Sequence, residues 1–200
     1  LLEQAAQSNK LMPNIDSILV GADRVREKKL LETMHVANCE HKIVTQLDQL
    51  DECVADLGEK LILKASRDGY DGYGQWRIFD ENQLQTTCAE LSDFDFIHMP
   101  LVAEQCVSFE REISLLGVTD AHGNHQYYPL TENHHGAGQL VLSLAPAPKV
   151  NAELQQKAQE IHDKIAAKLH YVGVLAIELF QMGDELLVNE IAPRVHNSGH

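Results

Sequence analysis

Basic residues are scarce in this chain of 200 residues, and it has no long hydrophobic run. Sixteen lysines and arginines stand against thirty aspartates and glutamates, so the formal net charge at pH 7 is −14. A general nucleic-acid-binding protein needs a basic face to displace counterions, and an anionic membrane repels an acidic surface. No hydrophobic run is long enough to span a bilayer. We therefore expect neither nucleic acid nor membrane as a partner, although a local basic pocket can still bind a small anion.

Cysteines are few and lack the spacing of a metal or redox motif. The four are Cys39, Cys53, Cys88 and Cys106, and no two of them form a CxxC pair. Scattered cysteines of this kind are typical of reduced thiols inside the cell. The first residues also lack the basic start and hydrophobic stretch of a signal peptide. We expect a cytoplasmic protein whose cysteines behave as small buried hydrophobic residues.

Both ends of the chain resemble internal positions of a longer protein. The chain begins in a hydrophobic, helix-like stretch without an initiator methionine, and it ends at His200 inside a polar cluster. We expect it to be a piece of a longer protein. A mass of 22.4 kDa allows one domain or two small ones.

The residue pattern predicts an α+β chain in two halves. In the first half we expect helices over 22–34, 47–57 and 81–91, and strands over 41–45, 60–65, 75–79 and 94–98. In the second half we expect β-rich runs over 110–119, 125–131 and 138–145, with turns at 120–124 and 133–138. A helix capped by Asn151 and two strands follow, over 151–170, 172–181 and 186–191. We expect a segment 1–20, a small lobe 21–100 and a larger lobe 101–200.

A glycine-rich loop lies between two of the expected strands. Residues 68–74 read DGYDGYG and contain Gly69, Gly72 and Gly74. A P-loop or a Rossmann fingerprint needs a helix directly after its glycines, so this context excludes both. A glycine-rich hairpin can still bring backbone N–H groups close to phosphates, and Lys64 would add a point charge. The alternative is an exposed hairpin with a solvated lysine, and the spacing favours neither interpretation.

Two glutamates lie in strongly hydrophobic strand patterns near the C-terminal end. Side chains alternate along a strand, so a two-residue loop of Gly183 and Asp184 would put Glu178 and Glu190 on opposite faces. A three-residue loop that includes Glu185 would set the two glutamates directly opposite each other. Like charges there are destabilising unless a divalent cation lies between them, and carboxylate oxygens suit Mg²⁺. The alternative is that one glutamate is exposed and the pair never meets.

The last residues form a polar cluster directly after the strand that carries Glu190. The cluster contains Arg194, His196 and Asn197. Arginine and histidine side chains bind anions or stabilise developing negative charge. The alternative is an exposed polar loop.

Eleven histidines are spread over the chain, and some of them are close in sequence. His122 with His125, and His134 with His135, suggest zinc binding at first sight. No thiolate and no HExxH pattern accompanies them, so we interpret them as scattered loop histidines.

Six segments, in this order, resemble one enzyme family. They are DRVREK (23–28), LKASRDGYDGYGQ (63–75), AEQCVSFEREISL (103–115), YPLTENHH (128–135), AIELF (176–180) and NEIAPRVHNSGH (189–200). From about residue 20 onwards the chain is similar to the 5-(carboxyamino)imidazole ribonucleotide synthases, which are ATP-grasp enzymes of purine biosynthesis. The GYDG and APR-x-HNSGH segments are specific to this family among ATP-grasp proteins.

The resemblance implies an ATP-grasp fold in which two α+β lobes clasp a nucleotide. It implies that ATP phosphorylates bicarbonate to carboxyphosphate, and that the carboxyl group passes to the exocyclic amine of 5-aminoimidazole ribonucleotide. Mg²⁺, with Mn²⁺ as an alternative, would bind at the phosphates, and the full-length enzyme would be a homodimer. The family's N-terminal Rossmann-like domain and C-terminal segment are missing, so we expect this chain alone to bind nucleotide weakly and not to turn over.

The resemblance also implies roles for individual positions. Glu178 and Glu190 would ligate Mg²⁺. The nucleotide would contact Arg24, Lys64, Gly69, Tyr70, Asp71, Gly72, Tyr73, Gly74, Gln75, Glu104, Gln105, Cys106, Val107, Glu112, His135, Asn189 and Glu190. Within this set, 69–75 would form a flap over the phosphates, 104–107 would be the adenine hinge, and Glu112 would accept from the ribose hydroxyls. The ribonucleotide would contact Tyr70 and Asp71, and the bicarbonate and carboxyphosphate pocket would be lined by Arg194, His196 and Asn197.

Two positions of the glycine loop depart from the family pattern. The family usually has a basic residue where this chain has Tyr73, and often has glycine where it has Asp68. Both changes lower the positive charge of the loop and weaken its expected hold on phosphates.

Three other functions are compatible with parts of the sequence. Another ATP-grasp carboxylase or ligase, such as the formate-dependent glycinamide ribonucleotide transformylase, is disfavoured by the HNSGH and GYDG segments. A non-catalytic nucleotide-binding module is disfavoured because Lys64, Glu178, Glu190 and Arg194 are intact. A histidine-rich metal-binding protein would bind zinc in the absence of ATP.

Overall fold

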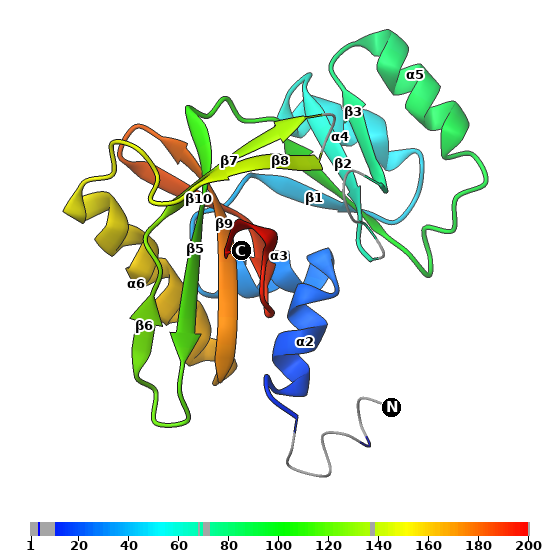
Figure 1. Ribbon diagram of the computed structural model, residues 1–200. Coiled ribbons are helices and arrows are strands. Elements are labelled where there is room, and N and C mark those ends of the chain that lie inside the picture. Colours follow the sequence, from blue (N-terminus) through cyan, green and yellow to red (C-terminus); the bar gives the residue numbers. More distant parts are fainter. Residues whose placement is uncertain (1–3, 5–10, 68, 70–72, 137–138, 200) are drawn as a thin grey trace.

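The computed structural model describes residues 4, 11–67, 69, 73–136 and 139–199 (Figure 1). The helices in this part are α2 (Ile15–Gly21), α3 (Arg24–Thr33), α4 (Gln49–Leu57), α5 (Glu81–Glu90), α6 (Ala152–Leu169) and the short 3₁₀ helix η1 (Asn197–Gly199). The strands are β1 (His41–Val44), β2 (Leu61–Ala65), β3 (Gln75–Ile78), β4 (Leu101–Gln105), β5 (Arg111–Thr119), β6 (His125–Tyr127), β7 (Thr131–Gly136), β8 (Gln139–Leu144), β9 (Gly173–Met182) and β10 (Glu185–Ala192).

These strands form two antiparallel sheets, each with its own hydrophobic core (Figure 1). The first sheet has the order β1-β4-β2-β3, and its core includes Leu63 together with Leu50 of α4 and Leu84 of α5. The second sheet has the order β10-β9-β5-β7-β8, with β6 paired to β5. Its core includes Leu31 of α3 and Ile165 of α6. The expected α+β class is confirmed.

The two sheets do not divide the chain at a single point. Strand β4 follows residue 100 but pairs with β1 and β2 in the first sheet. Conversely, Leu31 of the early helix α3 packs in the core of the second sheet. The chain therefore enters the strands of the second sheet only after Gln105. The lobe boundary expected at residues 100–101 and the separate segment 1–20 stay predictions.

Most of the expected elements agree with the structure to within a few residues. The helix expected over 151–170 is α6, and its cap is the expected one, because Asn151 Oδ1 accepts from the N–H of Leu154 at 2.7 Å. Asp23 caps α3 in the same way, with its carboxylate 3.0 Å from the N–H of Val25. Such caps satisfy N–H groups that the first turn of a helix leaves unpaired.

The strand expected over residues 94–98 is wrong. Phe94 and Phe96 have strand-like spacing, but both rings pack in an aromatic group with Trp76, with ring centroids 5.9 Å (Trp76 to Phe94) and 5.1 Å (Phe94 to Phe96) apart. The backbone turns here, because the carboxylate of Asp95 accepts from the N–H of His98 at 3.1 Å. The alternating pattern therefore reflects two aromatic anchors on a turn.

The turn expected over residues 133–138 is wrong for 133–136, which belong to β7, and residues 137–138 lie outside the described residues. Asn133 lies between β5 and β8 and joins their side chains. Its Nδ2 donates to Ser114 Oγ at 2.6 Å, and its Oδ1 accepts from Ser143 Oγ at 3.0 Å. Asparagine is common in turns, but these cross-strand hydrogen bonds keep it in the sheet.

The interpretation of the paired histidines as loop residues holds for one of the four. His122 lies in the loop between β5 and β6, whereas His125 is the first residue of β6. His134 and His135 are strand residues of β7. Their environments are therefore set by the second sheet and the elements packed on it.

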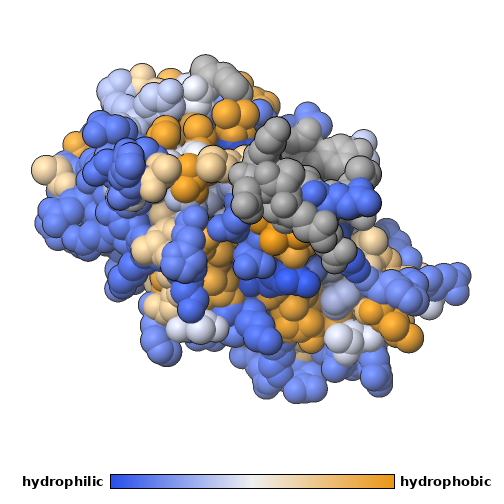
Figure 2. Space-filling model, turned by 90° about the horizontal axis from the view of Figure 1, so that it is seen from below, coloured by the Kyte–Doolittle hydropathy of each residue, from blue (hydrophilic) through white to orange (hydrophobic). Residues whose placement is uncertain are grey.

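The surface is largely polar. Figure 2 shows that the face seen from below carries mostly hydrophilic residues, with hydrophobic residues in smaller groups between them. None of the helices in the described part of the chain has the length and apolar character needed to cross a membrane. All four cysteines are free: Cys39 and Cys53 are buried as expected, whereas the expectation of burial is wrong for the partly exposed Cys88 and Cys106.

Candidate functional site

A cavity of about 440 Å³ lies between the two sheets. Strands β2, β3 and β4 supply one wall, and strands β5, β7, β8, β9 and β10 supply the other. A cavity of this size is typical of small-molecule sites. The residues predicted from the sequence that line it are Arg24, Lys64, Gly69, Gln75, Glu104, Gln105, Cys106, Val107, Glu112, His135, Glu178, Asn189, Glu190, Arg194, His196 and Asn197.

The glycine loop supplies fewer lining residues than expected. Gly69 and Gln75 line the cavity, but Tyr73 and Gly74 do not. Gly74 has a φ of +69°, a conformation that glycine adopts without strain, and it leads the chain into β3. The positions outside the described residues are Tyr70, Asp71 and Gly72, and their expected contacts stay predictions.

On the wall formed by the first sheet, one glutamate binds two lysines. Glu104 lies 2.9 Å from Lys28 Nζ and 2.6 Å from Lys64 Nζ, and all three side chains are buried. Burial alone would raise the pKa of Glu104, but Lys64 and Lys28 together outweigh it and lower the pKa to about 2. Lys64 also donates to Asn189 Oδ1 at 3.1 Å across the cavity. Lys64 is thus held in place by a buried ion pair, and we call Lys28, Lys64 and Glu104 the lysine triad.

On the wall formed by the second sheet, a β-bulge brings two glutamates together. The loop between β9 and β10 has two residues, and continued without interruption this register would place Glu190 opposite Ile177. The register shifts at Asn189, which is the extra residue of the bulge, so Glu190 lies opposite Glu178. The two-residue loop therefore forms, and the glutamates still meet.

Each carboxylate oxygen of Glu178 contacts a neighbouring side chain. Asn189 Nδ2 donates to Oε2 at 3.3 Å, and His196 Nε2 lies 3.1 Å from Oε1. Ser198 contacts His196 Nδ1 with its backbone N–H at 3.3 Å and with its hydroxyl at 2.9 Å, and this orients Nε2 toward the carboxylate. Burial by itself would raise the pKa of Glu178, but the hydrogen bond and charge of His196 outweigh it and lower the pKa.

Glu112 of β5 lies on the same wall, and its pKa shifts in the opposite direction. His135 Nδ1 lies 3.4 Å from Glu112 Oε1. Burial, and after it the charge of Glu178, raise the pKa of Glu112 to about 8. We call Glu112, Glu178 and Glu190 the glutamate wall.

Helix α3 supplies an arginine to this wall and a glutamate that sequence reasoning missed. Arg24 Nη2 lies 2.8 Å from Glu190 Oε2, and Glu27, one helical turn later, accepts from the N–H of Ile191 at 2.8 Å. Burial would lower the pKa of Arg24, but Glu190 and Glu27 outweigh it and raise the pKa. Burial also raises the pKa of Glu27 to about 7. The spacing of three residues from Arg24 is the signal that could have identified Glu27.

A sequence profile of the ATP-grasp domain matches residues 29–200. The chain belongs to the ATP-grasp family. Among curated ATP-grasp relatives, the N5-carboxyaminoimidazole ribonucleotide synthase of Vibrio cholerae is 43% identical over 202 residues, which cover 100% of this chain and 53% of the relative. The chain thus spans about half the length of the curated relatives it matches.

Solved structures confirm the ATP-grasp fold. The N5-carboxyaminoimidazole ribonucleotide synthetase of Thermus thermophilus superposes with a TM-score of 0.86 at 38% identity, over 98% of this chain and 53% of that one. The Aspergillus clavatus enzyme in complex with ADP and 5-aminoimidazole ribonucleotide superposes with a TM-score of 0.85 at 27% identity, over 100% of this chain and 51% of that one.

The ATP-grasp cavity also has an apolar side that sequence reasoning missed. The rings of Phe109 and Phe180 stack with centroids 4.3 Å apart and an interplanar angle of 9°. Ile62 and Leu140 line the cavity as well. Phe180 could have been identified, since it is two residues after Glu178 on the same strand face. The other missed lining residues are Cys39, Arg77 and Phe79.

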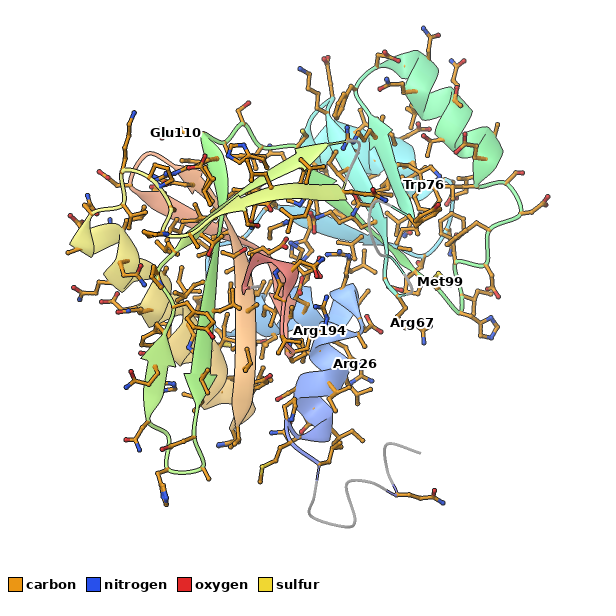
Figure 3. The ribbon with its side chains drawn as sticks, viewed as in Figure 1. Arg26, Arg67, Trp76, Met99, Glu110 and Arg194 are labelled. Carbon is orange, nitrogen blue, oxygen red and sulfur yellow. The ribbon has the colours of Figure 1, made fainter. Side chains whose placement is uncertain are left out.

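Arg194 reaches the ATP-grasp cavity from the segment after β10. In the view of Figure 3 Arg194 lies near the centre of the molecule, close to helices α2 and α3, whereas Glu110, directly before β5, lies at the upper left. Gly21, the last residue of α2, fits closely against this segment, because a Cβ there would be only 2.1 Å from Pro193 Cδ. This close contact holds the segment that carries Arg194 against the helix.

The ATP-grasp site offers the ligand atoms that Mg²⁺ prefers. Glu178 and Glu190 present carboxylates from paired strands, and the amide of Asn189 lies between them in sequence at the bulge. Like charges directly opposite each other are destabilising, and here His196 and Arg24 provide the compensating hydrogen bonds. Carboxylate and amide oxygens of this kind fit a hard divalent cation.

Proposed function

We propose that the full-length protein carries out the ATP- and bicarbonate-dependent carboxylation of 5-aminoimidazole ribonucleotide, a carbon–nitrogen ligation in purine biosynthesis. ATP would phosphorylate bicarbonate to carboxyphosphate, and the carboxyl group would pass to the exocyclic amine of the ribonucleotide, leaving ADP and phosphate. The relatives are N5-carboxyaminoimidazole ribonucleotide synthases, and the Aspergillus clavatus structure contains ADP and 5-aminoimidazole ribonucleotide, which supports the substrate. The observation that carries the proposal is the bulged pair Glu178 and Glu190, which faces Lys64 across one cavity.

The nucleotide would lie between the lysine triad and the glutamate wall. The apolar side of the cavity, with Phe180 and Ile62, suits a purine ring. The N–H groups of Gln105 and Cys106 already donate to backbone carbonyls of other segments, so Val107 is the next N–H available to read the base. Glu112 would accept from the ribose hydroxyls, and Lys64 has one donor left for a phosphate after binding Glu104 and Asn189.

Mg²⁺, or Mn²⁺ in its place, would be held by Glu178 and Glu190 and would neutralise charge on the phosphates. Arg24 orients Glu190, and His196 orients Glu178, by the hydrogen bonds described above. These contacts hold both carboxylates ready before nucleotide binds, which lowers the reorganisation needed on binding.

The bicarbonate and carboxyphosphate pocket would be formed by Arg194, His196 and Asn197, which line the same cavity. Arginine suits a planar anion, because its guanidinium donates two parallel hydrogen bonds. Carboxyphosphate decomposes in water, so the glycine hairpin between β2 and β3 would act as a flap that limits water access. We also propose that the full-length protein is a cytoplasmic homodimer, as the resemblance implies.

The test is phosphate release by the full-length protein with ATP, Mg²⁺ and bicarbonate, with and without 5-aminoimidazole ribonucleotide. We expect release that depends on the ribonucleotide. Release that is indifferent to it would leave an ATP-grasp ligase with another substrate, and no release would favour a non-catalytic nucleotide-binding module.

Glu178→Gln tests the site itself. The change keeps the shape of the side chain but removes its charge, so we expect turnover to fall by roughly 100-fold or more with the fold intact. Glu185→Gln is the matched control, because Glu185 is an exposed glutamate on the same β10 that carries Glu190. Full activity of Glu178→Gln would contradict the metal assignment.

A further inference from the structure

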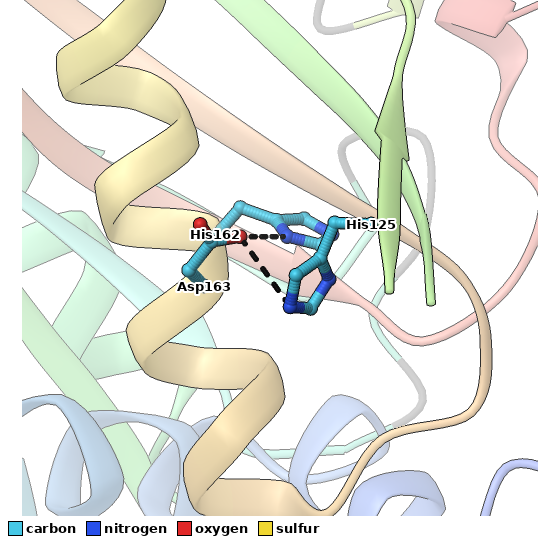
Figure 4. A group of neighbouring side chains, drawn as sticks. All are labelled: His125, His162 and Asp163. Carbon is cyan, nitrogen blue, oxygen red and sulfur yellow. Dashed lines mark hydrogen bonds and ion pairs between the residues drawn. The ribbon is translucent and has the colours of Figure 1, made fainter. Parts of the chain in front are cut away.

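A second cluster of metal-binding side chains lies away from the nucleotide cavity. His125 comes from β6, and His162 and Asp163 come from α6 (Figure 4). None of the three lines the cavity. Thr119, next to the cluster, and Glu112, in the cavity wall, are seven residues apart on β5, which corresponds to roughly 23 Å along the strand. The cluster is therefore independent of the proposed function.

The spacing of the three side chains is close to that of a metal centre. Asp163 Oδ1 lies 3.4 Å from His162 Nδ1 and 3.8 Å from His125 Nε2. The ligand atoms of all three residues are within 4.8 Å of one another. In a tetrahedral zinc site, bonds of about 2.0–2.2 Å place neighbouring ligand atoms about 3.3–3.5 Å apart. The two distances to Asp163 are therefore within about half an ångström of this spacing.

Two further side chains orient the cluster from outside, as second partners do in protein metal sites. Thr119 Oγ1 lies 2.9 Å from His125 Nδ1, which turns His125 Nε2 toward Asp163. The hydroxyl of Tyr127 donates to Asp163 Oδ1. Both the histidine and the carboxylate are therefore held with one ligand atom facing the centre of the cluster.

His162 is buried more completely than a histidine in a surface ion pair would be. Its side chain is completely buried, and its Nε2 lies against the backbone of Gly117. Gly117 of β5 makes room for the ring, because a Cβ there would be 2.3 Å from Nε2. A buried imidazole favours the neutral form, which is the form that binds metal ions. The buried ring thus presents Nδ1 to the partly exposed Asp163.

We propose that His125, His162 and Asp163 form a binding site for a divalent transition metal ion, with Zn²⁺ as the ion that the two nitrogens and one oxygen suit best. Two imidazoles disfavour Mg²⁺ and Ca²⁺, which prefer oxygen ligands. The ion would lie between β6 and α6, among the two ring nitrogens and the carboxylate. Asp163 and His125 are partly exposed, so a water molecule can supply the fourth ligand.

The test is calorimetric titration of the full-length protein with Zn²⁺, without nucleotide and with excess Mg²⁺ to occupy the glutamate wall. Co²⁺, followed by its visible absorption, gives a second measurement that reports tetrahedral coordination. We expect one equivalent of Zn²⁺ to bind. His125→Ala should weaken binding at least tenfold, and Asp163→Asn should have a similar effect. Both residues are partly exposed, so both variants should fold.

The matched control is His122→Ala, which removes an exposed histidine three residues from His125. It should leave Zn²⁺ affinity unchanged. Thr119→Val, which removes the partner of His125 Nδ1, should weaken affinity by about 10-fold, as loss of an outer partner does in other metal sites. Failure of the unmodified protein to bind Zn²⁺, or binding that His125→Ala and Asp163→Asn leave unchanged, would overturn the proposal and leave a hydrogen-bonded cluster. Neither outcome depends on ligase activity.

Discussion

The two walls of the cavity both bury glutamates, but they handle the charge in opposite ways. On the first sheet, Glu104 is enclosed by Lys28 and Lys64, and its pKa falls to about 2. On the second sheet, Glu112 has a histidine 3.4 Å away and a second glutamate nearby, and its pKa rises to about 8. Burial penalises the charged form in both places, so the number of adjacent cations decides the outcome.

The difference separates a buried ion pair from a wall whose carboxylates have fewer cations beside them. In the lysine triad, two lysines lie against Glu104 within the protein, and Lys64 is fixed at the cavity. In the glutamate wall, Glu190 pairs with Arg24 and Glu178 contacts His196. Glu112 has no ion pair with a lysine or arginine among the described residues, and burial keeps its carboxyl protonated to a higher pH.

The largest expected effect on stability comes from breaking the lysine triad. Glu104→Gln would leave Lys28, which is fully buried, and Lys64 without their carboxylate. Loss of one partner of a buried ion pair costs about 3–5 kcal/mol. We expect the free energy of unfolding, measured with urea, to fall by this amount. A change within the error of the measurement would mean that the triad is more hydrated than its burial indicates.

Glu112→Gln should instead raise the free energy of unfolding. The pKa of Glu112 is raised in the folded chain to about 8 from 4.5, so stability present in full below pH 4.5 is lost as the pH rises toward 8. The amide cannot ionise, so the stability of the variant relative to the unmodified protein should rise by up to about 1.4 kcal/mol per pH unit, or roughly 4 kcal/mol between pH 5 and pH 8. Urea titrations at the two pH values measure it. A variant that loses stability at pH 8 would show that Glu112 is charged and well paired.

A smaller loss of stability is expected when the contact between the two walls, made by Asn189, is removed. Asn189 accepts from Lys64 and donates to Glu178, so Asn189→Ala removes two hydrogen bonds to charged groups. We expect about 1–2 kcal/mol of destabilisation, since the side chain is only partly buried. ADP binding in the presence of Mg²⁺ should also weaken. If binding is unchanged while stability falls, the bulge matters only for folding.

The smallest effect is expected from an exposed ion pair. Lys42 binds Glu52 and Asp56 on the surface of α4, and both partners raise its pKa. Solvent screens such pairs, so Lys42→Ala should leave the urea midpoint unchanged within error. A clear shift would show that exposed and buried pairs differ less in this protein than their burial indicates.

Much of the site could be predicted from the sequence, because short motifs carry it. The segments around Lys64, Glu112, Glu178 and Arg194 are contiguous, and all four residues line the cavity. Lys28 and Glu27 were missed, because their partners, Glu104 and the N–H of Ile191, are distant in sequence; only the spacing of Glu27 from Arg24 gave a local signal. The aromatic turn at 94–98 was misread, since Phe-x-Phe spacing is the same in a strand and on a turn with two buried rings.

The sequence by itself determined the α+β class, the glycine hairpin, the capped helix α6 and the family, since each depends on local spacing or on motifs. The tertiary structure alone decided that Glu190 lies opposite Glu178 and that Glu104 and Glu112 shift in opposite directions. A single inserted residue in β10 sets the first. The opposite pKa shifts depend on which basic side chains lie next to each glutamate. Those side chains come from other strands and from helix α3, so the packing of distant segments decides them.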